Sequence, residues 1–324
     1  MIRRSAARDA IEESRGQRHG LMYLAMTLVV TFWAANMVAG KYAFRGFDAM
    51  AVAQLRVLGA AAIYGVAYLT RSGPPRARLT RREWIFYGVT ALTGVTLNQL
   101  FFIGGLDRSS VADTGLIVAL GPVTVLVLAW MMGLEAMTQL KLIGIIISFA
   151  GVAVLTAVGP QGVNGRNWAG NLMLLAGTVV FSYYTILMKE AAYHLDELTL
   201  SSLTFGLGAL LMLPFAGEAV WKIRWSTIPG VAYGGLAFMV VLGTVVPYWL
   251  FAYSMTGLSA TRVAAFNYLQ PVIASALAIW LLSERLTLGT WVGGALILLG
   301  VYLTERGQGE KPLSRERQEL RLWA

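Results

Sequence analysis

Two stretches of the chain decide its fold: residues 120–152, LGPVTVLVLAWMMGLEAMTQLKLIGIIISFAGV, and residues 269–301, LQPVIASALAIWLLSERLTLGTWVGGALILLGV. A shift of 149 residues places one on the other with ten identities in 33 positions. The identities include Pro122 with Pro271 and Glu135 with Glu284, which apolar composition alone rarely produces. Upstream, a shift of 148 pairs Asp48 with Asp196. The sequence therefore predicts two related halves.

The composition assigns these halves to a membrane. Of the 324 residues, 57% are hydrophobic and only 13% are charged, whereas a soluble domain has roughly 25% charged residues. A helix needs about 20 apolar residues to cross a bilayer. Such segments predict an all-α integral membrane protein with ten transmembrane helices at 21–44, 49–70, 84–106, 111–132, 140–158, 168–188, 198–215, 228–254, 263–282 and 288–303.

Each half, 21–158 and 168–304, holds five of these segments. Because five is odd, the second half enters the membrane from the side opposite to the first, so the repeats are inverted. Short loops rich in Lys and Arg stay in the cytoplasm. With the N-terminus inside, eighteen basic residues lie on the inner side and six on the outer side. We therefore expect cytoplasmic tails at 1–20 and 305–324.

The residue inventory excludes several function classes. The chain has no cysteine and only two histidines, His19 and His194, so we expect no metal site, no Ser-His-Asp relay and no cofactor. Most of the net charge of +9 lies in the tails and in the 71–82 loop, where it faces lipid headgroups rather than nucleic acid. These features argue against an enzyme.

Helix breaks and polar side chains at midplane depth indicate where a solute would bind. Pro122, Pro247 and Pro271 lie near the middle of their segments, and breaks at matching positions mark the binding region of inverted-repeat transporters. Polar and aromatic residues of similar depth are the substrate-binding candidates: Trp33, Asn36, Asn98, Gln99, Tyr184, Thr244, Tyr248, Asn267 and Gln270. Their alternative role is to join helices by hydrogen bonds or ordinary packing.

Arg56 is the most deeply placed charge, roughly 10 Å into the second segment. Its guanidinium suits a substrate carboxylate, which it can bind with two parallel hydrogen bonds. Snorkelling to the interface and neutralising a helix end are the structural alternatives. No Asp or Glu lies at the midplane, so proton exchange and facilitated diffusion both stay open.

The chain resembles the drug/metabolite transporter superfamily, whose ten-helix members have two EamA domains. The resemblance is carried by Gly105-Leu106-Asp107-Arg108-Ser109-Ser110-Val111-Ala112 running to Pro122 and Gly133-Leu134-Glu135, and by Gly257-Leu258-Ser259-Ala260-Thr261 running to Pro271 and Leu282-Ser283-Glu284-Arg285-Leu286. The sequence departs from the usual pattern with Ala136 after Glu135 and with Trp33-Ala34-Ala35-Asn36 in place of Trp-Gly-Ser-Asn. The resemblance implies a midplane cavity and a small organic substrate.

These observations predict a secondary transporter that exports small metabolites such as amino acids by alternating access. An exporter of aromatic or cationic compounds, or a passive channel, is the alternative. We expect a multi-pass protein of a bacterial inner membrane whose partners are the substrate and the bilayer. Monomer and homodimer both stay open.

Overall fold

The computed structural model describes residues 2–71, 79–158, 166–191, 195–255, 258 and 266–307. Every regular element among them is helical, which confirms the all-α prediction. Nine helices in the described ranges are long and apolar enough to cross a membrane, and Leu269–Leu282 is a shorter apolar helix. The expected start of the ninth segment, at residue 263, lies outside the described residues.

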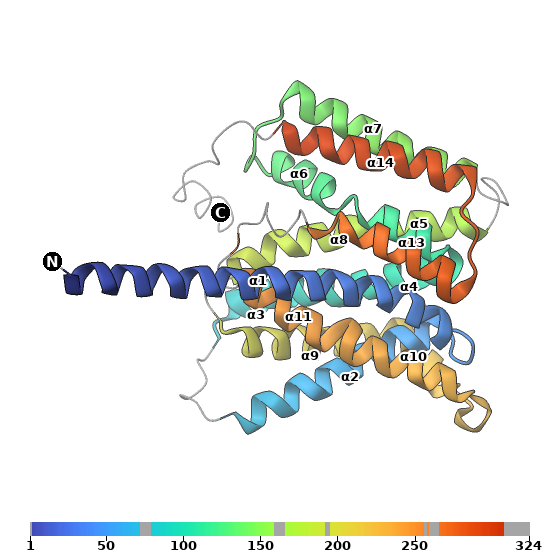
Figure 1. The fold of residues 1–324 in the computed structure, drawn as a ribbon. Coiled ribbons are helices and arrows are strands. Elements are labelled where there is room, and N and C mark those ends of the chain that lie inside the picture. The colour runs from blue at the N-terminus through green and yellow to red at the C-terminus, as the bar shows by residue number, and fades with distance from the viewer. Residues whose placement is uncertain are drawn as a thin grey trace.

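The first half comprises α1 (Ile2–Ala43), α2 (Ala49–Thr70), α3 (Arg81–Ala91), η1 (Leu92–Leu97), α4 (Asn98–Arg108), α5 (Val111–Val118), α6 (Gly121–Met131) and α7 (Gln139–Ala157). The second comprises α8 (Arg166–Ala191), α9 (Glu197–Trp221), η3 (Trp225–Thr227), α10 (Gly230–Val240), η4 (Val241–Val245), α11 (Val246–Met255), α13 (Leu269–Leu282) and α14 (Leu288–Arg306). Most of the predicted N-terminal tail continues α1 as a helix, since it is rich in Arg and Ala. The start of α1 and the end of α14 lie on the same side of the bundle (Figure 1).

Residues shared by the repeats begin equivalent helices. Asp48 caps α2 by accepting a hydrogen bond from the Met50 amide, and its repeat mate Asp196 caps α9 through the Thr199 amide. Thr138 and Thr287, which match at a shift of 149, cap α7 and α14 in the same way. A short polar side chain satisfies one of the free amides of a helix start, so these identities have a structural cause.

Helices α7 and α14 cross through glycines at matching positions of the two halves. A Cβ on Gly151 would lie 2.7 Å from the Gly293 carbonyl oxygen, and Gly144 faces Gly300 equally closely. Each glycine therefore contacts the repeat mate of the other, as a two-fold relation requires. Figure 1 shows the two helices side by side at one edge of the bundle. Small residues permit this close approach in a membrane.

The predicted breaks occur at corresponding places. The fourth segment is interrupted at Ala119 and Leu120, and Pro122 lies in the first turn of α6. The ninth is interrupted at Asn267 and Tyr268, and Pro271 lies in the first turn of α13. The third and eighth segments contain a second matched pair of irregularities, the π-helices η1 and η4, whose first residues are 149 positions apart. The sequence did not predict these π-helices.

Candidate functional site

The α-helical hydrogen-bond pattern of the eighth segment is interrupted at the π-helix η4, and Arg56 hydrogen-bonds to the backbone there. Arg56 Nε donates a hydrogen bond to Thr244 Oγ1 at 2.6 Å, and Nη2 donates to the Gly243 carbonyl oxygen at 2.8 Å. Pro247 has no N–H, so it cannot donate to this carbonyl four residues earlier. The guanidinium supplies the missing donor. The predicted break at Pro247 and the predicted charge at Arg56 are thus two parts of one arrangement.

Two neighbouring hydrogen bonds fix η4, one to the first half and one within the eighth segment. Tyr64 of α2 donates its hydroxyl to the Val245 carbonyl oxygen at 2.7 Å. Thr244 donates to the Met239 carbonyl oxygen at 2.8 Å while its oxygen accepts from Arg56. The hydroxyl hydrogen of Thr244 is therefore already used, and in this conformation Thr244 orients Arg56.

Two buried polar atoms beside Gly243 lack a hydrogen-bond partner among the described residues: Arg56 Nη1 and Asn36 Oδ1. The Arg56 side chain is 3% exposed and Asn36 is 2% exposed. Asn36 Oδ1 is the atom nearest to where a Gly243 Cβ would lie, so only glycine permits the contact. An unsatisfied polar group at membrane depth costs several kcal/mol. A free donor and a free acceptor thus adjoin one residue of the π-helix.

A cluster of aromatic rings includes Trp33, which is three residues before Asn36, and Tyr248, which follows Pro247. The ring centre of Trp33 lies 6.1 Å from that of Tyr248, 6.3 Å from that of Phe181 and 5.7 Å from that of Phe251. Phe205 packs edge-on against Tyr248 at 5.1 Å. Phe181 and Phe205 were absent from the sequence-derived candidates. Phe181 carried a usable signal, since it is the repeat mate of Trp33 at a shift of 148.

Tyr184 occupies the place in the second half that Asn36 occupies in the first. The two are repeat mates at a shift of 148, and the Tyr184 ring fills the space that a Cβ on Gly94 would need. Gly94 lies in η1 and is the mate of Gly243 in η4. Each π-helix is therefore met at its glycine by the same position of the opposite half.

The remaining amide candidates are not hydrogen-bonded to Arg56 or Asn36 among the described residues. Asn98 donates to the Gly177 carbonyl oxygen at 3.3 Å, and Gln99 donates to Asn98 Oδ1 at 3.4 Å. Asn267 lies in the turn before α13, and Gln270 is buried in its first turn. In the described ranges no hydrogen bond joins these four amides to Arg56 or Asn36. Gln99 Oε1 is a further buried acceptor without a partner there.

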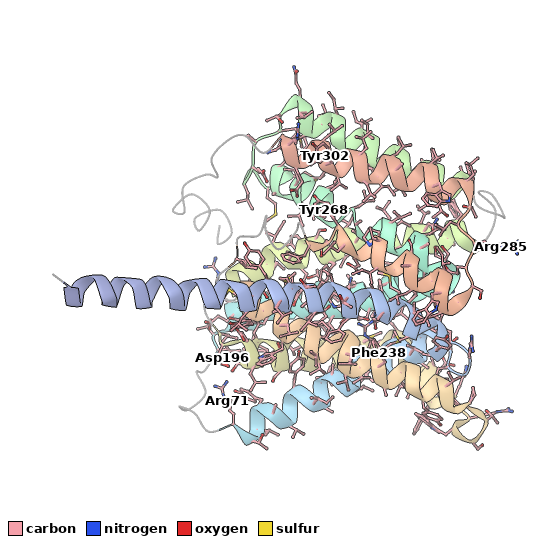
Figure 2. All side chains as sticks on the ribbon, viewed as in Figure 1. Arg71, Asp196, Phe238, Tyr268, Arg285 and Tyr302 are labelled. Atoms are coloured by element: carbon pink, nitrogen blue, oxygen red, sulfur yellow. The ribbon has the colours of Figure 1, made fainter. Side chains whose placement is uncertain are left out.

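At one end of the bundle, the loop before α14 is hydrogen-bonded to the start of α5. Glu284 accepts hydrogen bonds from the amides of Val111 at 3.1 Å and Ala112 at 3.4 Å, at the start of α5. Asp113 accepts from Thr290 Oγ1 at 2.9 Å. The repeat mate Glu135 instead forms an ion pair with Lys141 at 2.8 Å. Arg285 lies at the side of the bundle opposite to Arg71 and Asp196 (Figure 2).

Comparisons with known proteins agree with this architecture. The EamA-like transporter family matches residues 20–157 and 168–306. An uncharacterized transporter of Archaeoglobus fulgidus is 26% identical over 287 residues, 88% of this chain and 98% of its own. The uncharacterized transporter YvbV of Bacillus subtilis is 28% identical, covering 86% of this chain and 90% of its own. A chloroplastic WAT1-related protein of Arabidopsis thaliana is 24% identical, covering 89% and 70%.

A solved crystal structure superposes with a TM-score of 0.61 at 17% identity, covering 89% of this chain and 99% of its own. At that identity the likeness concerns the fold. The family match extends over both halves and confirms the two repeats of a multi-pass integral membrane protein. The chain belongs to the EamA-like transporter family, within the drug/metabolite transporter superfamily.

Proposed function

We propose that this transporter exports small metabolites that carry both a carboxylate and an amino group, such as amino acids. The observation that supports it is the pair of unpartnered buried atoms beside Gly243. Arg56 Nη1 is a charged donor that suits a carboxylate oxygen. Asn36 Oδ1 is an acceptor that suits an ammonium group. A zwitterion would satisfy both atoms at once.

The aromatic rings around Trp33 favour a substrate with an apolar side chain. Trp33, Tyr248 and Phe251 would contact that side chain while Arg56 and Asn36 hold the charged groups. A site with apolar walls and a few orienting polar groups is the usual composition of a small-molecule site. Gln99 and Gln270 would contact the substrate at a later step of its passage.

Alternating access would follow from exchanging the conformations of the halves. Here Glu284 holds the start of α5, whereas Glu135 pairs with Lys141. In the opposite state Glu284 would release α5 and Glu135 would make the corresponding contact at the other membrane face. The paired breaks at Pro122 and Pro271 and the paired π-helices would bend during this exchange. We place the protein in the cytoplasmic membrane of a bacterium with both termini inside.

A second candidate function is the export of aromatic or cationic compounds. It is favoured by the cluster of Trp33, Tyr248, Phe181 and Phe251, since aromatic faces attract cations. Arg56 beside this cluster opposes a cationic substrate, so the zwitterion is the better fit. A passive channel would need no buried donor and acceptor paired in this way.

Counterflow in liposomes tests the proposal. Purified protein is reconstituted, loaded with one unlabelled solute and offered labelled amino acids, a quaternary ammonium compound or a sugar. We expect saturable counterflow of amino acids that is lost in Asn36→Ala and kept in a matched change at Asn267. Counterflow of the ammonium compound alone would favour the second function, and flux without saturation would favour a channel.

A further inference from the structure

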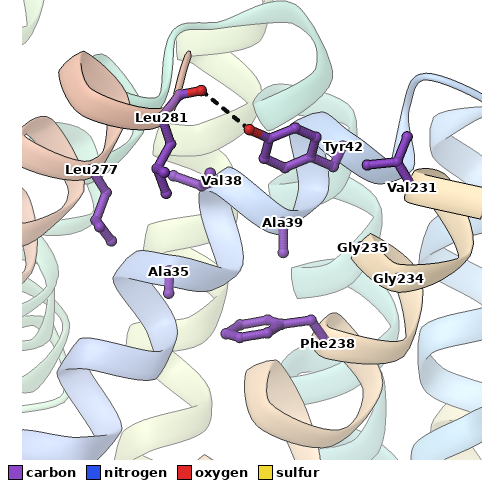
Figure 3. A pocket seen from close by; sticks show the side chains of 10 residues that line it. All are labelled: Ala35, Val38, Ala39, Tyr42, Val231, Gly234, Gly235, Phe238, Leu277 and Leu281. Atoms are coloured by element: carbon purple, nitrogen blue, oxygen red, sulfur yellow. Dashed lines mark hydrogen bonds between the residues drawn. The ribbon is translucent and has the colours of Figure 1, made fainter. Parts of the chain in front are cut away.

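An apolar groove lies outside the candidate site, between α1, α10 and α13. Its volume is about 350 Å³. Small residues form much of its floor, and larger apolar side chains form its rims (Figure 3). The lining residues are Ala35, Val38, Ala39, Tyr42, Val231, Gly234, Gly235, Phe238, Leu277 and Leu281.

The groove is suited to hydrocarbon. Tyr42 carries the one polar side-chain group of this lining, and its hydroxyl donates to the Leu281 carbonyl oxygen at 3.1 Å. This bond joins α1 to α13 at one end of the groove, as Figure 3 shows. From Ala35 to Tyr42 the α1 wall extends for about 10 Å at 1.5 Å per residue. These dimensions fit part of an alkyl chain.

Charge lies at the Tyr42 end. The guanidinium carbon of Arg45 lies 4.6 Å from the centre of the Tyr42 ring, and Arg45 is exposed. The rims are exposed too, with Val231 at 45% and Leu281 at 41%. In a membrane-spanning protein such a face meets lipid. A phosphate is the anionic group that lipids present where the hydrocarbon region ends.

We propose that this groove is a phospholipid site, in which one acyl chain lies between α1, α10 and α13 while the phosphate binds Arg45. The apolar lining accounts for the chain, and the cation at one end accounts for the headgroup. The site is separate from Arg56 and Asn36, so it does not depend on which solute the protein carries.

Glycines provide a matched pair of variants. A Cβ on Gly234 would meet no heavy atom within 4 Å, so Gly234→Leu can enter the groove without displacing protein. Gly65 in α2 is equally open and lies away from the groove, so Gly65→Leu is the control. Gly235 is unsuitable, because its Cβ would lie 2.6 Å from the Ala39 carbonyl oxygen. Arg45→Gln removes the charge.

The test uses the full chain in nanodiscs that contain phosphatidylglycerol with a photoreactive diazirine on one acyl chain. After illumination, mass spectrometry of peptides locates the label. We expect enrichment in 35–42 and 231–238 over the exposed α9 face at 210–215. Gly234→Leu should reduce this labelling about fivefold, because leucine displaces several methylene groups, whereas Gly65→Leu should not. Equal labelling of α9 and the groove in the wild-type protein would overturn the proposal, whatever the stability of the variants.

A diazirine-bearing monoacylglycerol, which lacks phosphate, tests the headgroup contact. We expect Arg45→Gln to reduce labelling by the phospholipid and to leave labelling by the monoacylglycerol unchanged. An equal effect on both probes, or no effect on either, would remove Arg45 from the site. Labelling that persists unchanged in folded Gly234→Leu would show that the chain does not enter the groove.

Discussion

Replacing Arg56 tests separately the structural role that its hydrogen bonds show and the binding role that we propose. Two of its nitrogens hold η4 at 2.6 and 2.8 Å, and the third is the proposed carboxylate donor. A hydrogen bond with a charged partner is worth about 1.5–3 kcal/mol. If Nη1 binds substrate, Arg56→Gln should therefore weaken substrate affinity about 10- to 100-fold, since about 1.4 kcal/mol corresponds to a factor of ten.

Pro247 supplies a matched rescue of the structural role. Arg56→Gln should lower the thermal unfolding midpoint, because the Gly243 carbonyl loses its donor. Pro247→Ala restores an N–H in the same stretch of backbone, so Arg56→Gln/Pro247→Ala should recover part of that loss. It should not recover affinity, because the amide cannot replace Nη1. Thr244→Val removes the Nε acceptor and a bond to Met239, so it should lower stability by about 1–2 kcal/mol. Because Nη2 still binds Gly243, this variant should weaken affinity less than Arg56→Gln does.

The assay is the half-saturation of counterflow, paired with the unfolding midpoint of each variant in the same detergent. The binding role is refuted if Arg56→Gln keeps the wild-type half-saturation while losing stability. It is equally refuted if Pro247→Ala restores stability and affinity together, since Arg56 would then act only as a partner for the carbonyl that Pro247 leaves free.

Three further predictions concern the scaffold. Gly94→Ala and Gly243→Ala should each lower the free energy of unfolding by about 1–3 kcal/mol, because the added methyl overlaps Tyr184 or Asn36. Gly88→Ala is the control: its methyl meets nothing within 4 Å, so it should be neutral when unfolding is measured in the same way. Glu284→Gln should raise the rate at which a thiol reagent modifies a single cysteine placed at buried Thr114, because the hydrogen bonds from α5 to residue 284 weaken. An unchanged rate would contradict the role of Glu284 in holding the start of α5. The pKa of Asp196 is lowered, because hydrogen bonds from Thr199 and Arg71 outweigh the effect of its partial burial. Its charge therefore stabilises the fold at neutral pH. The difference in unfolding midpoint between the wild-type protein and Asp196→Asn should begin to shrink as the pH falls to the ordinary aspartate value of 3.8 and should vanish only below the lowered pKa of the folded state.

The sequence predicted the parts of the fold that depend on local patterning. Span boundaries follow from apolar length, and the interruptions at Pro122 and Pro271 follow from the missing N–H of proline. The repeat paired Asp48 with Asp196, and the structure shows that both residues are helix caps. Local patterning could not predict the π-helices. An extra residue in a helical turn is stabilised by tertiary contacts, here by Arg56 on η4, and such contacts leave no local pattern.

The candidate site was predicted only in part for the same reason. Asn36 and Arg56 were recognisable, since polar side chains at membrane depth must face the protein interior. That Arg56 binds Gly243 was not, because 187 residues separate them and the contact depends on how α2 packs on the eighth segment. Phe181 and Phe205 carry no polar group, so their depth alone did not distinguish them from ordinary core residues.

The two halves share the same order of helices and breaks but differ in the side chains at matched positions, and the proposed function depends on this difference. At a shift of 148, Arg56 corresponds to Thr204, whose hydroxyl bonds to Leu200 in its own helix at 2.7 Å. Asn36 corresponds to Tyr184. The elements that would exchange between states in the proposed cycle, which are the π-helices, the broken segments and the crossing of α7 and α14, are therefore duplicated. Among the described residues, the groups that would hold a zwitterion occur once, beside η4, so in the proposed cycle the symmetric frame would serve movement and a single off-axis site would serve recognition.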